Sequence, residues 1–214
     1  MISKFEQLEE LFLEINKNLN FKVDVFMIGG AALLHKKLKP STKDVDLIVK
    51  FDKDYAEFKR TLLSIKFKAK TLSALYTHLE LENQFERSDF LLDIFAKKVC
   101  GKLSLSDEMM KRAELFKEYS KLTVYFCALE DIFLFKTITE RPTDEDDCSA
   151  IAQREIDWDA ILKEIKNQIK LSKKEIWVTL INERLESLDE KNVKIPILNE
   201  TQKLTLKYYD EHSL

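Results

Sequence analysis

The sequence predicts an α/β (α+β) fold in which a small mixed β-sheet, backed by helices, precedes a mostly helical C-terminal region. Short apolar strands alternate with amphipathic helices in the first part of the chain. From Leu129 onward nearly every segment has helical periodicity. The chain has 214 residues, 45% of them hydrophobic, which is enough for a substantial core. We expect a core over residues 1–105 and a helical region over 106–214 packed against it.

The N-terminal part should supply the sheet and its backing helices. A helix is predicted over 3–19, where Ser3 and Glu6 form a capping box before an apolar face. "VDVFMI" then favours a strand that ends at two glycines, and "GAALLHKKL" favours a short helix that Pro40 ends. The further expected elements are a strand at 44–51, a helix at about 53–65, an ambiguous edge strand or helix within 66–85 that includes "YTHLELE", and a core strand at 89–99.

The C-terminal part is expected to begin with a helix and a short strand or link, and to be helical beyond them. "SDEMMKRAELFKEYS" (106–120) indicates a capped helix, and "KLTVYFCA" (121–128) indicates a short strand or an extended link. The helices expected beyond it lie at 129–139, about 145–154, 157–170, 172–188 and about 199–211.

Composition excludes several classes of protein. The net charge is −3 with both signs mixed, which argues against a protein that coats nucleic acid by bulk charge. The three cysteines are far apart and form no CxxC pair, so we expect reduced thiols in a cytoplasmic protein, with neither a disulfide framework nor a zinc site. No apolar run approaches the roughly 18 residues that span a bilayer, and the N-terminus does not have the pattern of a signal peptide.

Gly29 and Gly30 are the first candidate site residues. They lie between a predicted strand and a predicted helix in a chain with only 3 glycines. Glycine adopts positive φ at tight turns and allows close approach to its backbone. The free N–H groups of a helix N-terminus favour an anion such as a phosphate. The pair therefore predicts either a phosphate contact or a plain strand–helix turn.

Three aspartates form the second candidate group. Asp44 and Asp46 are two residues apart, so on a strand both point to the same face. Such a pair indicates a Mg²⁺ site, or an exposed strand edge with two solvated acids. Asp93 lies within the apolar run "FLLDIFA", where a carboxylate must be paired or bind metal. If the two strands are neighbours, the three carboxylates form one cluster; otherwise Asp93 forms a salt bridge.

These residues together resemble the nucleotidyltransferase superfamily of polymerase beta type, over about residues 20–155. The block "EDIFLFKTITERPTDEDDCSAI" is most similar to the abortive-infection toxin-like nucleotidyltransferases, in which a helical lysine, an arginine and an Asp-rich turn follow in this order. Lys136, Arg141, Asp144 and Asp147 match that arrangement. The chain departs from many relatives in having Ala31, rather than Ser or Thr, after the glycine pair.

The resemblance implies a site and a reaction. Asp44, Asp46 and Asp93 would hold two Mg²⁺ ions, and an acceptor hydroxyl would attack the α-phosphate of an NTP. The nucleotide-binding residues would be Gly29, Gly30, Ser41, Thr42, Lys136 and Arg141. For Lys136 and Arg141 the alternative is an ordinary helix surface, and for Asp144 and Asp147 we expect helix capping.

The main hypothesis is thus a Mg²⁺-dependent transfer of NMP from an NTP to a hydroxyl on an RNA 3′ end, a protein or a small molecule. The resemblance alone suggests a toxin with an antitoxin partner. The alternatives are a non-catalytic nucleotide- or RNA-binding protein on the same fold, and an interaction protein whose acids only form salt bridges.

Overall fold

The protein is described here by a computed structural model covering residues 5–70, 83–88, 90–139, 141–171 and 176–212. The strands are β1 (Val23–Ile28), β2 (Val45–Val49), β3 (Lys68–Lys70), β4 (Asn83–Arg87), β5 (Phe90–Ala96), β6 (Lys98–Val99), β7 (Leu103–Ser104), β8 (Glu114–Glu118) and β9 (Leu122–Phe126). The helices are α1 (Phe5–Asn18), α2 (Gly29–His35), α3 (Asp52–Ser64), α5 (Asp107–Arg112), α6 (Leu129–Thr137), α7 (Pro142–Ala152), α8 (Trp158–Leu171), α9 (Trp177–Glu190) and α10 (Leu198–His212).

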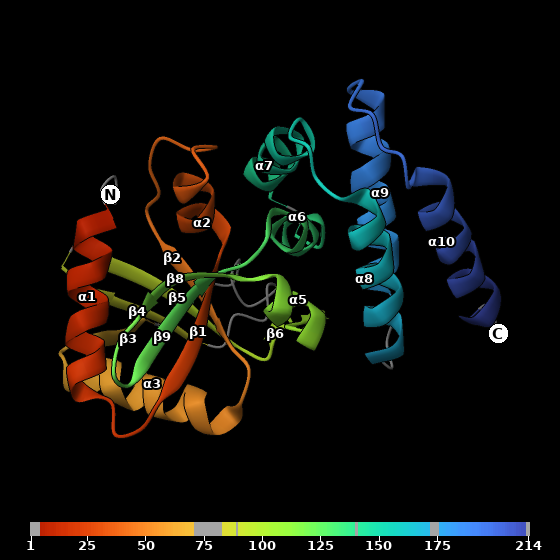
Figure 1. The fold of residues 1–214 in the computed structure, drawn as a ribbon. Helices are drawn as coiled ribbons and strands as arrows, with labels where there is room; N and C mark the ends of the chain where they lie inside the picture. Colours follow the sequence, from red (N-terminus) through yellow and green to blue (C-terminus); the bar gives the residue numbers. More distant parts are fainter. Residues whose placement is uncertain (1–4, 71–82, 89, 140, 172–175, 213–214) are drawn as a thin grey trace.

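Seven of the strands form one mixed sheet in the order β3-β4-β5-β2-β1-β9-β8 (Figure 1). β1 pairs antiparallel with β2 and parallel with β9, and β2 pairs parallel with β5. The predicted α/β class with a mixed sheet and a helical C-terminal region is therefore confirmed. β6 and β7 form a separate two-stranded hairpin.

The two faces of the sheet differ in character. On β1, Val23, Val25 and Met27 are buried on the face that α1 and α3 cover, and the apolar sides of these two helices complete the main core. The opposite face carries Ile28 next to Asp46, because the β1–β2 register pairs these two residues. The second face therefore carries the Asp46 carboxylate, away from the core under α1 and α3.

Two segments differ from the prediction. The helix expected over 106–120 ends at Arg112, and Glu114–Glu118 is strand β8 because it pairs antiparallel with β9. Pairing with the adjacent strand β9, in a hairpin that β9 joins to the rest of the sheet through β1, overrides the local helical preference here. Within the ambiguous segment, Lys68–Lys70 and Asn83–Arg87 are strands, whereas "YTHLELE" lies outside the described residues.

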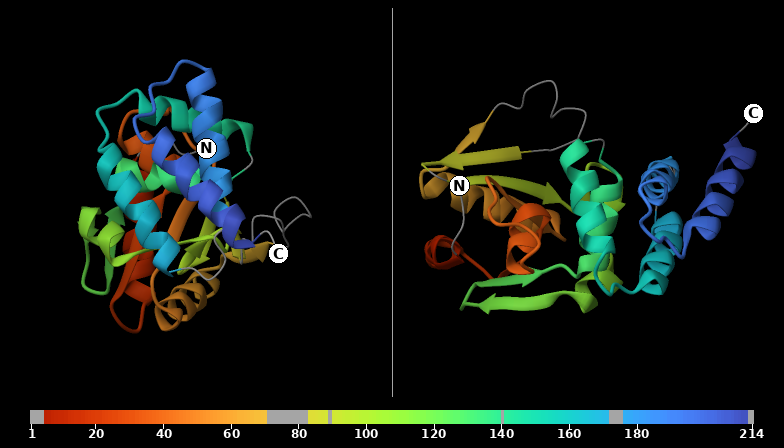
Figure 2. Two further views of the ribbon diagram at one scale, coloured as in Figure 1. Left: turned by 90° about the vertical axis from the view of Figure 1, so that its right-hand side faces the viewer. Right: turned by 90° about the horizontal axis from the view of Figure 1, so that it is seen from above.

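The sheet extends beyond the boundary expected at residue 105. β8 and β9 belong to it, and the helical region begins with α6 at Leu129. We therefore propose that the sheet-containing unit runs to about Phe126 and that the helical unit follows it. Figure 2 shows α10 at the end farthest from the sheet, where it packs on α9.

A buried ion-pair cluster joins the helices next to the sheet. Arg112 at the end of α5 donates to Asp131 of α6 at 2.6 Å and to Glu164 of α8 at 3.0 Å. Both carboxylates are almost fully buried, and burial raises the pKa of Asp131 to about 6 even though Arg112 lowers it. Arg112 therefore compensates two acids that could not otherwise remain charged inside the protein.

Two further sequence expectations concern the chain as a whole. Cys100, Cys127 and Cys148 are free and buried, in keeping with reduced thiols. None of the described helices combines the length and the apolar character that a bilayer span requires.

Removing the Arg112 cation should destabilise the fold strongly. We expect Arg112→Met to lower the free energy of unfolding by about 3–5 kcal/mol at pH 8, because two buried carboxylates lose their partner. The loss should be smaller at pH 5, where Asp131, with its pKa raised to about 6, can bind a proton. Urea unfolding at both pH values measures the effect. The adjacent Lys111→Met, which removes an exposed pair with Glu108, should leave the free energy of unfolding almost unchanged; equal effects of the two variants would contradict the assignment.

Candidate functional site

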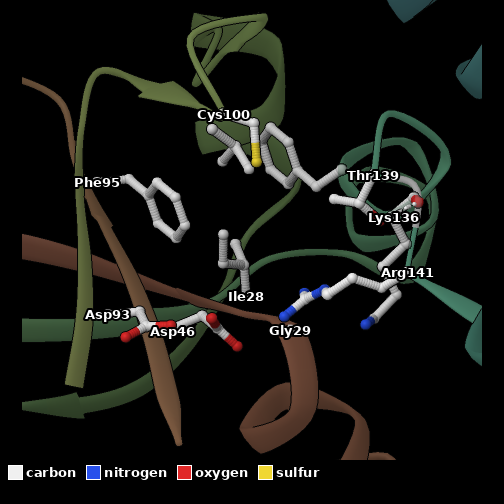
Figure 3. A pocket seen from close by; sticks show the side chains of 11 residues that line it. Ile28, Gly29, Asp46, Asp93, Phe95, Cys100, Lys136, Thr139 and Arg141 are labelled. Atoms are coloured by element: carbon white, nitrogen blue, oxygen red, sulfur yellow. Dashed lines mark hydrogen bonds between the residues drawn. The ribbon is translucent and has the colours of Figure 1, made fainter. Parts of the chain in front are cut away.

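A pocket lies where the sheet meets α6, and five of the sequence-predicted residues line it. Gly29, Asp46, Asp93, Lys136 and Arg141 surround it together with Thr139. Figure 3 shows the two carboxylates on one side and the Arg141 guanidinium pointing across the pocket toward Asp46. The apolar part of the wall consists of Ile28, Phe95, Val99, Cys100 and Phe135.

The glycine pair makes room for side chains of the chain itself. Gly29 begins α2 with φ +65°, a region that disfavours other residues. A Cβ at Gly29 would lie 1.9 Å from Oδ2 of Asp46, and a Cβ at Gly30 would lie 2.4 Å from Oγ1 of Thr42. Both positions thus require glycine for packing. A phosphate contact by either glycine stays a prediction.

Asp46 and Asp93 are neighbours because β2 and β5 pair in parallel with these two residues in register. Burial is the largest cause of the raised pKa of Asp46, followed by repulsion from Asp44 and Asp93. Burial likewise raises the pKa of Asp93 to about 6, although a hydrogen bond from Gln84 opposes the rise. The structure therefore brings two carboxylates together in a setting that disfavours their charge.

Asp44 and the two predicted hydroxyl residues lie on the loop that leads into β2. The Thr42 hydroxyl donates to the backbone oxygen of Asp44 at 3.0 Å and approaches its carboxylate at 3.3 Å. Asp44 precedes the strand, yet its charge raises the pKa of both Asp46 and Asp93. Thr42 is buried and Ser41 is half-buried. Thr42 thus orients Asp44, and nucleotide contacts by either hydroxyl stay predictions.

The Lys–Arg–Asp block forms a buried ion-pair network. The Lys136 ammonium lies 2.6 Å from both Asp144 and Asp147, and the Arg141 Nε donates to Asp144 at 2.7 Å. Burial disfavours the charged form of Lys136, but the two aspartates outweigh it and raise its pKa. The capping expected of Asp144 and Asp147 is wrong: no side chain caps α7, and both carboxylates bind cations instead. Lys136 is buried and does not lie on an ordinary helix surface.

Two polar residues of the site were not expected from the sequence. Gln84 on β4 donates to Asp93 Oδ1 at 2.7 Å. The Thr139 hydroxyl donates to Asp144 at 2.5 Å and also lines the pocket. No local signal could identify Gln84, because its role depends on the register of β4 against β5. Thr139 lies in the matched block, but its partner follows only from the turn between α6 and α7.

The donor chemistry of the site fits a divalent cation. Among the residues that the structure describes, no three His, Cys, Asp or Glu side chains converge as a ready ligand set. Asp46 and Asp93 nevertheless offer adjacent carboxylate oxygens, which are the ligands that Mg²⁺ prefers. A cation between them would offset the repulsion that raises their pKa values. Asp44 lies on the loop before β2, and its role as a third ligand stays a prediction.

Replacing Gly29 should destabilise the fold and displace Asp46. We expect Gly29→Ala to lower the free energy of unfolding by about 2–4 kcal/mol, because it combines a disfavoured positive φ with a clash at the carboxylate. Urea unfolding measures the loss. Gly101→Ala is the matched control, since Gly101 has φ +61° but is exposed.

The control separates the two causes of that loss. Gly101→Ala should cost only about 1 kcal/mol, which is the backbone contribution. Gly29→Ala should cost much less in an Asp46→Ala background, where the clashing carboxylate is absent. An unchanged cost in that background would show that Asp46 does not require the glycine.

Neutralising Asp93 should stabilise the metal-free protein at high pH. The rise of its pKa from 3.8 to about 6 corresponds to about 3 kcal/mol, at 1.36 kcal/mol per pKa unit. Below about pH 4 the Asp93 carboxyl is protonated in both the folded and the unfolded protein. Because its pKa is raised in the folded protein, ionisation of Asp93 destabilises the fold increasingly as the pH rises from about 4 through about 6. Asp93→Asn should therefore raise the free energy of unfolding at pH 8 by up to about 3 kcal/mol, and little at pH 4.

Urea unfolding in the presence of a chelator, at pH 4, 6 and 8, measures this difference. Asp24→Asn, at an exposed position on the neighbouring strand β1, is the control and should have little effect at any of these pH values. A destabilisation by Asp93→Asn at pH 8 would show that the carboxylate is favourably paired.

No curated protein matches the chain by sequence. Similar solved structures include ANT(2″)-Ia in complex with adenylyl-2″-tobramycin, with 13% identity, a TM-score of 0.45, and coverage of 78% of this chain and 99% of that chain. A protein from H. pylori assigned as a nucleotidyltransferase has 14% identity, a TM-score of 0.40, and coverage of 95% of this chain and 99% of that chain.

The family comparison covers most of the chain. Residues 3–194 match a family described as nucleotidyltransferase of unknown function (DUF6036). The matched range includes the glycine pair, the three aspartates and the Lys–Arg–Asp block. This protein therefore belongs to that family of nucleotidyltransferases.

Proposed function

We propose that this protein transfers NMP from an NTP to an acceptor hydroxyl in a Mg²⁺-dependent reaction. The supporting observation is the pairing of Asp46 and Asp93 on adjacent strands, in a pocket that they share with Arg141 and Gly29. Buried acids that repel one another are costly unless a cation joins them. The cost that they impose on the metal-free protein is an argument for a functional rather than a structural role.

The three aspartates are the proposed metal ligands. Asp44 and Asp46 would hold the ion of the incoming triphosphate, and Asp93 would complete the site of a second ion. Bound Mg²⁺ ions would supply positive charge at both the attacking and the departing oxygen. Thr42 and Gly29 keep the first two acids in place, because Thr42 donates to Asp44 and Gly29 makes room for Asp46.

The chemical step needs a base and a cation besides the metal ions. The acceptor oxygen bonds to the α-phosphorus while the bond from that phosphorus to its bridging oxygen breaks, and pyrophosphate leaves. Asp93, whose strand lies next to that of Asp46, is the proposed acceptor of the hydroxyl proton. Arg141 points into the pocket and is the proposed contact of the departing phosphates, and Lys136 adds positive charge behind it.

Two further proposals, on the acceptor and on the biological role, depend on the sequence resemblance alone. The sequence resemblance suggests an RNA 3′ end, a protein or a small molecule as acceptor, and a toxin with an antitoxin partner. A transfer screen with α-labelled NTPs and these three acceptor classes tests the first proposal. Growth of cells that express the wild type, compared with cells that express an inactive variant, tests the second.

The central prediction concerns Asp46. We expect one or more of ATP, GTP, CTP and UTP to raise the melting temperature of the wild type only when Mg²⁺ is present, because the ligand binds only the folded state. Asp46→Asn, which retains the shape next to Gly29, should abolish this shift and lower labelled transfer by at least about 100-fold. Asp24→Asn on the exposed part of β1 is the matched control and should retain both.

The alternatives give different results in the same experiment. Nucleotide binding that survives Asp46→Asn, without transfer by the wild type to any acceptor, would favour a non-catalytic nucleotide-binding protein. The absence of any shift with all four nucleotides would exclude the proposed function and favour an interaction protein whose acids are only structural.

A further inference from the structure

One ion pair links the loop of the metal-binding acids to the helix behind Arg141. The Lys39 ammonium lies 2.7 Å from Oδ2 of Asp147, although the two residues are 108 positions apart. Lys39 precedes Pro40 on the loop between α2 and β2, and Asp147 lies on α7. The Asp147 side chain is 6% exposed and that of Lys39 is 30% exposed, so the pair is largely shielded from water.

Asp147 also connects this pair to the pocket. Its Oδ2 accepts from Lys136 at 2.6 Å, Lys136 binds Asp144 at 2.6 Å, and Asp144 accepts from Arg141 at 2.7 Å. We call the side chains of Lys39, Asp147, Lys136, Asp144 and Arg141 the charge chain. Positive and negative groups alternate along it, from the loop at one end to the pocket at the other.

The loop itself is anchored at few points. Just after α2, Lys37 has φ +58° and its N–H donates to the carbonyl of Leu34, and the N–H of Leu38 donates to the carbonyl of Leu33. Thr42 packs directly over Gly30 and donates to Asp44. Between these two contacts, Lys39 provides the ion pair that joins the loop to the helical region. The placement of Asp44 relative to Arg141 should therefore depend on Lys39.

We propose that Lys39 is a positioning residue of the site, which through Asp147 sets the distance between the loop of Asp44 and the guanidinium of Arg141. Lys39 does not line the pocket, so it acts through other residues. This inference rests on the proposed function, since Asp44 and Arg141 are taken to bind opposite ends of the same metal–nucleotide complex. The charge chain therefore couples the position of Asp44 to that of Arg141.

The first test uses binding, which requires no acceptor. Calorimetry with the α,β-methylene analogues of ATP, GTP, CTP and UTP, each with Mg²⁺, gives the dissociation constant of the folded protein. Lys39→Met should weaken binding of the preferred analogue by about tenfold, the usual size of coupling through such networks. Lys39→Arg retains the charge and should remain within about threefold of the wild type. Lys36→Met is the matched control, because Lys36 lies on the same turn but pairs with Glu114 of β8.

The second test does not depend on the proposed function. Hydrogen exchange of the nucleotide-free protein reports whether Lys39 holds the loop. The amides of residues 38–44 should exchange at least about tenfold faster in Lys39→Met than in the wild type or in Lys36→Met. A purely stabilising role would instead speed exchange throughout the fold and leave the dissociation constant unchanged.

The outcomes separate the two proposals. If the wild type binds none of the analogues, the proposed function fails, and local exchange at residues 38–44 still decides whether Lys39 positions the loop. If the wild type binds but Lys39→Met binds equally well, or if Lys39→Arg does not restore binding, the positioning role is wrong. Equal weakening by Lys36→Met and Lys39→Met would also overturn it.

Discussion

The close contact between the Asp46 carboxylate and the backbone of Gly29 is the constraint on which the site depends. The β1–β2 register places Ile28 beside Asp46, so the first residue after β1 must lie against that carboxylate. Only glycine leaves the necessary space and adopts φ +65° without strain. The conformation of the turn from β1 into α2 and the position of the Asp46 carboxylate therefore depend on each other.

The electrostatics of the site follow from this crowding. Asp46 and Asp93 lie next to each other on the face of the sheet that borders the pocket, and Asp44 adds a third negative charge. Arg141 opposes these charges, but Asp144 already holds the same guanidinium. The metal-free pocket thus holds more carboxyl groups than its cations compensate, and the pKa values of Asp46 and Asp93 rise. Such an arrangement favours a ligand that brings divalent cations with it.

The helical region contributes residues to the site and is not only a C-terminal extension of the sheet. α6 supplies Lys136, the turn after it supplies Arg141, and α7 supplies the aspartates that hold both. The Arg112 cluster fixes α6 against α5 and α8. By contrast, α10 lies beyond the family match and packs on α9, away from the pocket. Two buried ion-pair networks therefore hold together the helices next to the pocket.

The sequence by itself determined the elements and motifs whose signals are local. Periodicity predicted strands at 23–28 and 44–51, which the structure has as β1 and β2, and most helices; the glycine pair with Asp46 and Asp93 indicated the site. Tertiary structure decided which strands pair, their register and the contacts between distant segments, because pairing energy does not appear in a local pattern. The β8 strand, the bond from Gln84 to Asp93 and the ion pair from Lys39 to Asp147 are of this kind. Asp144 and Asp147 had the spacing of capping residues, but only the burial of Lys136 between them shows that they neutralise a cation.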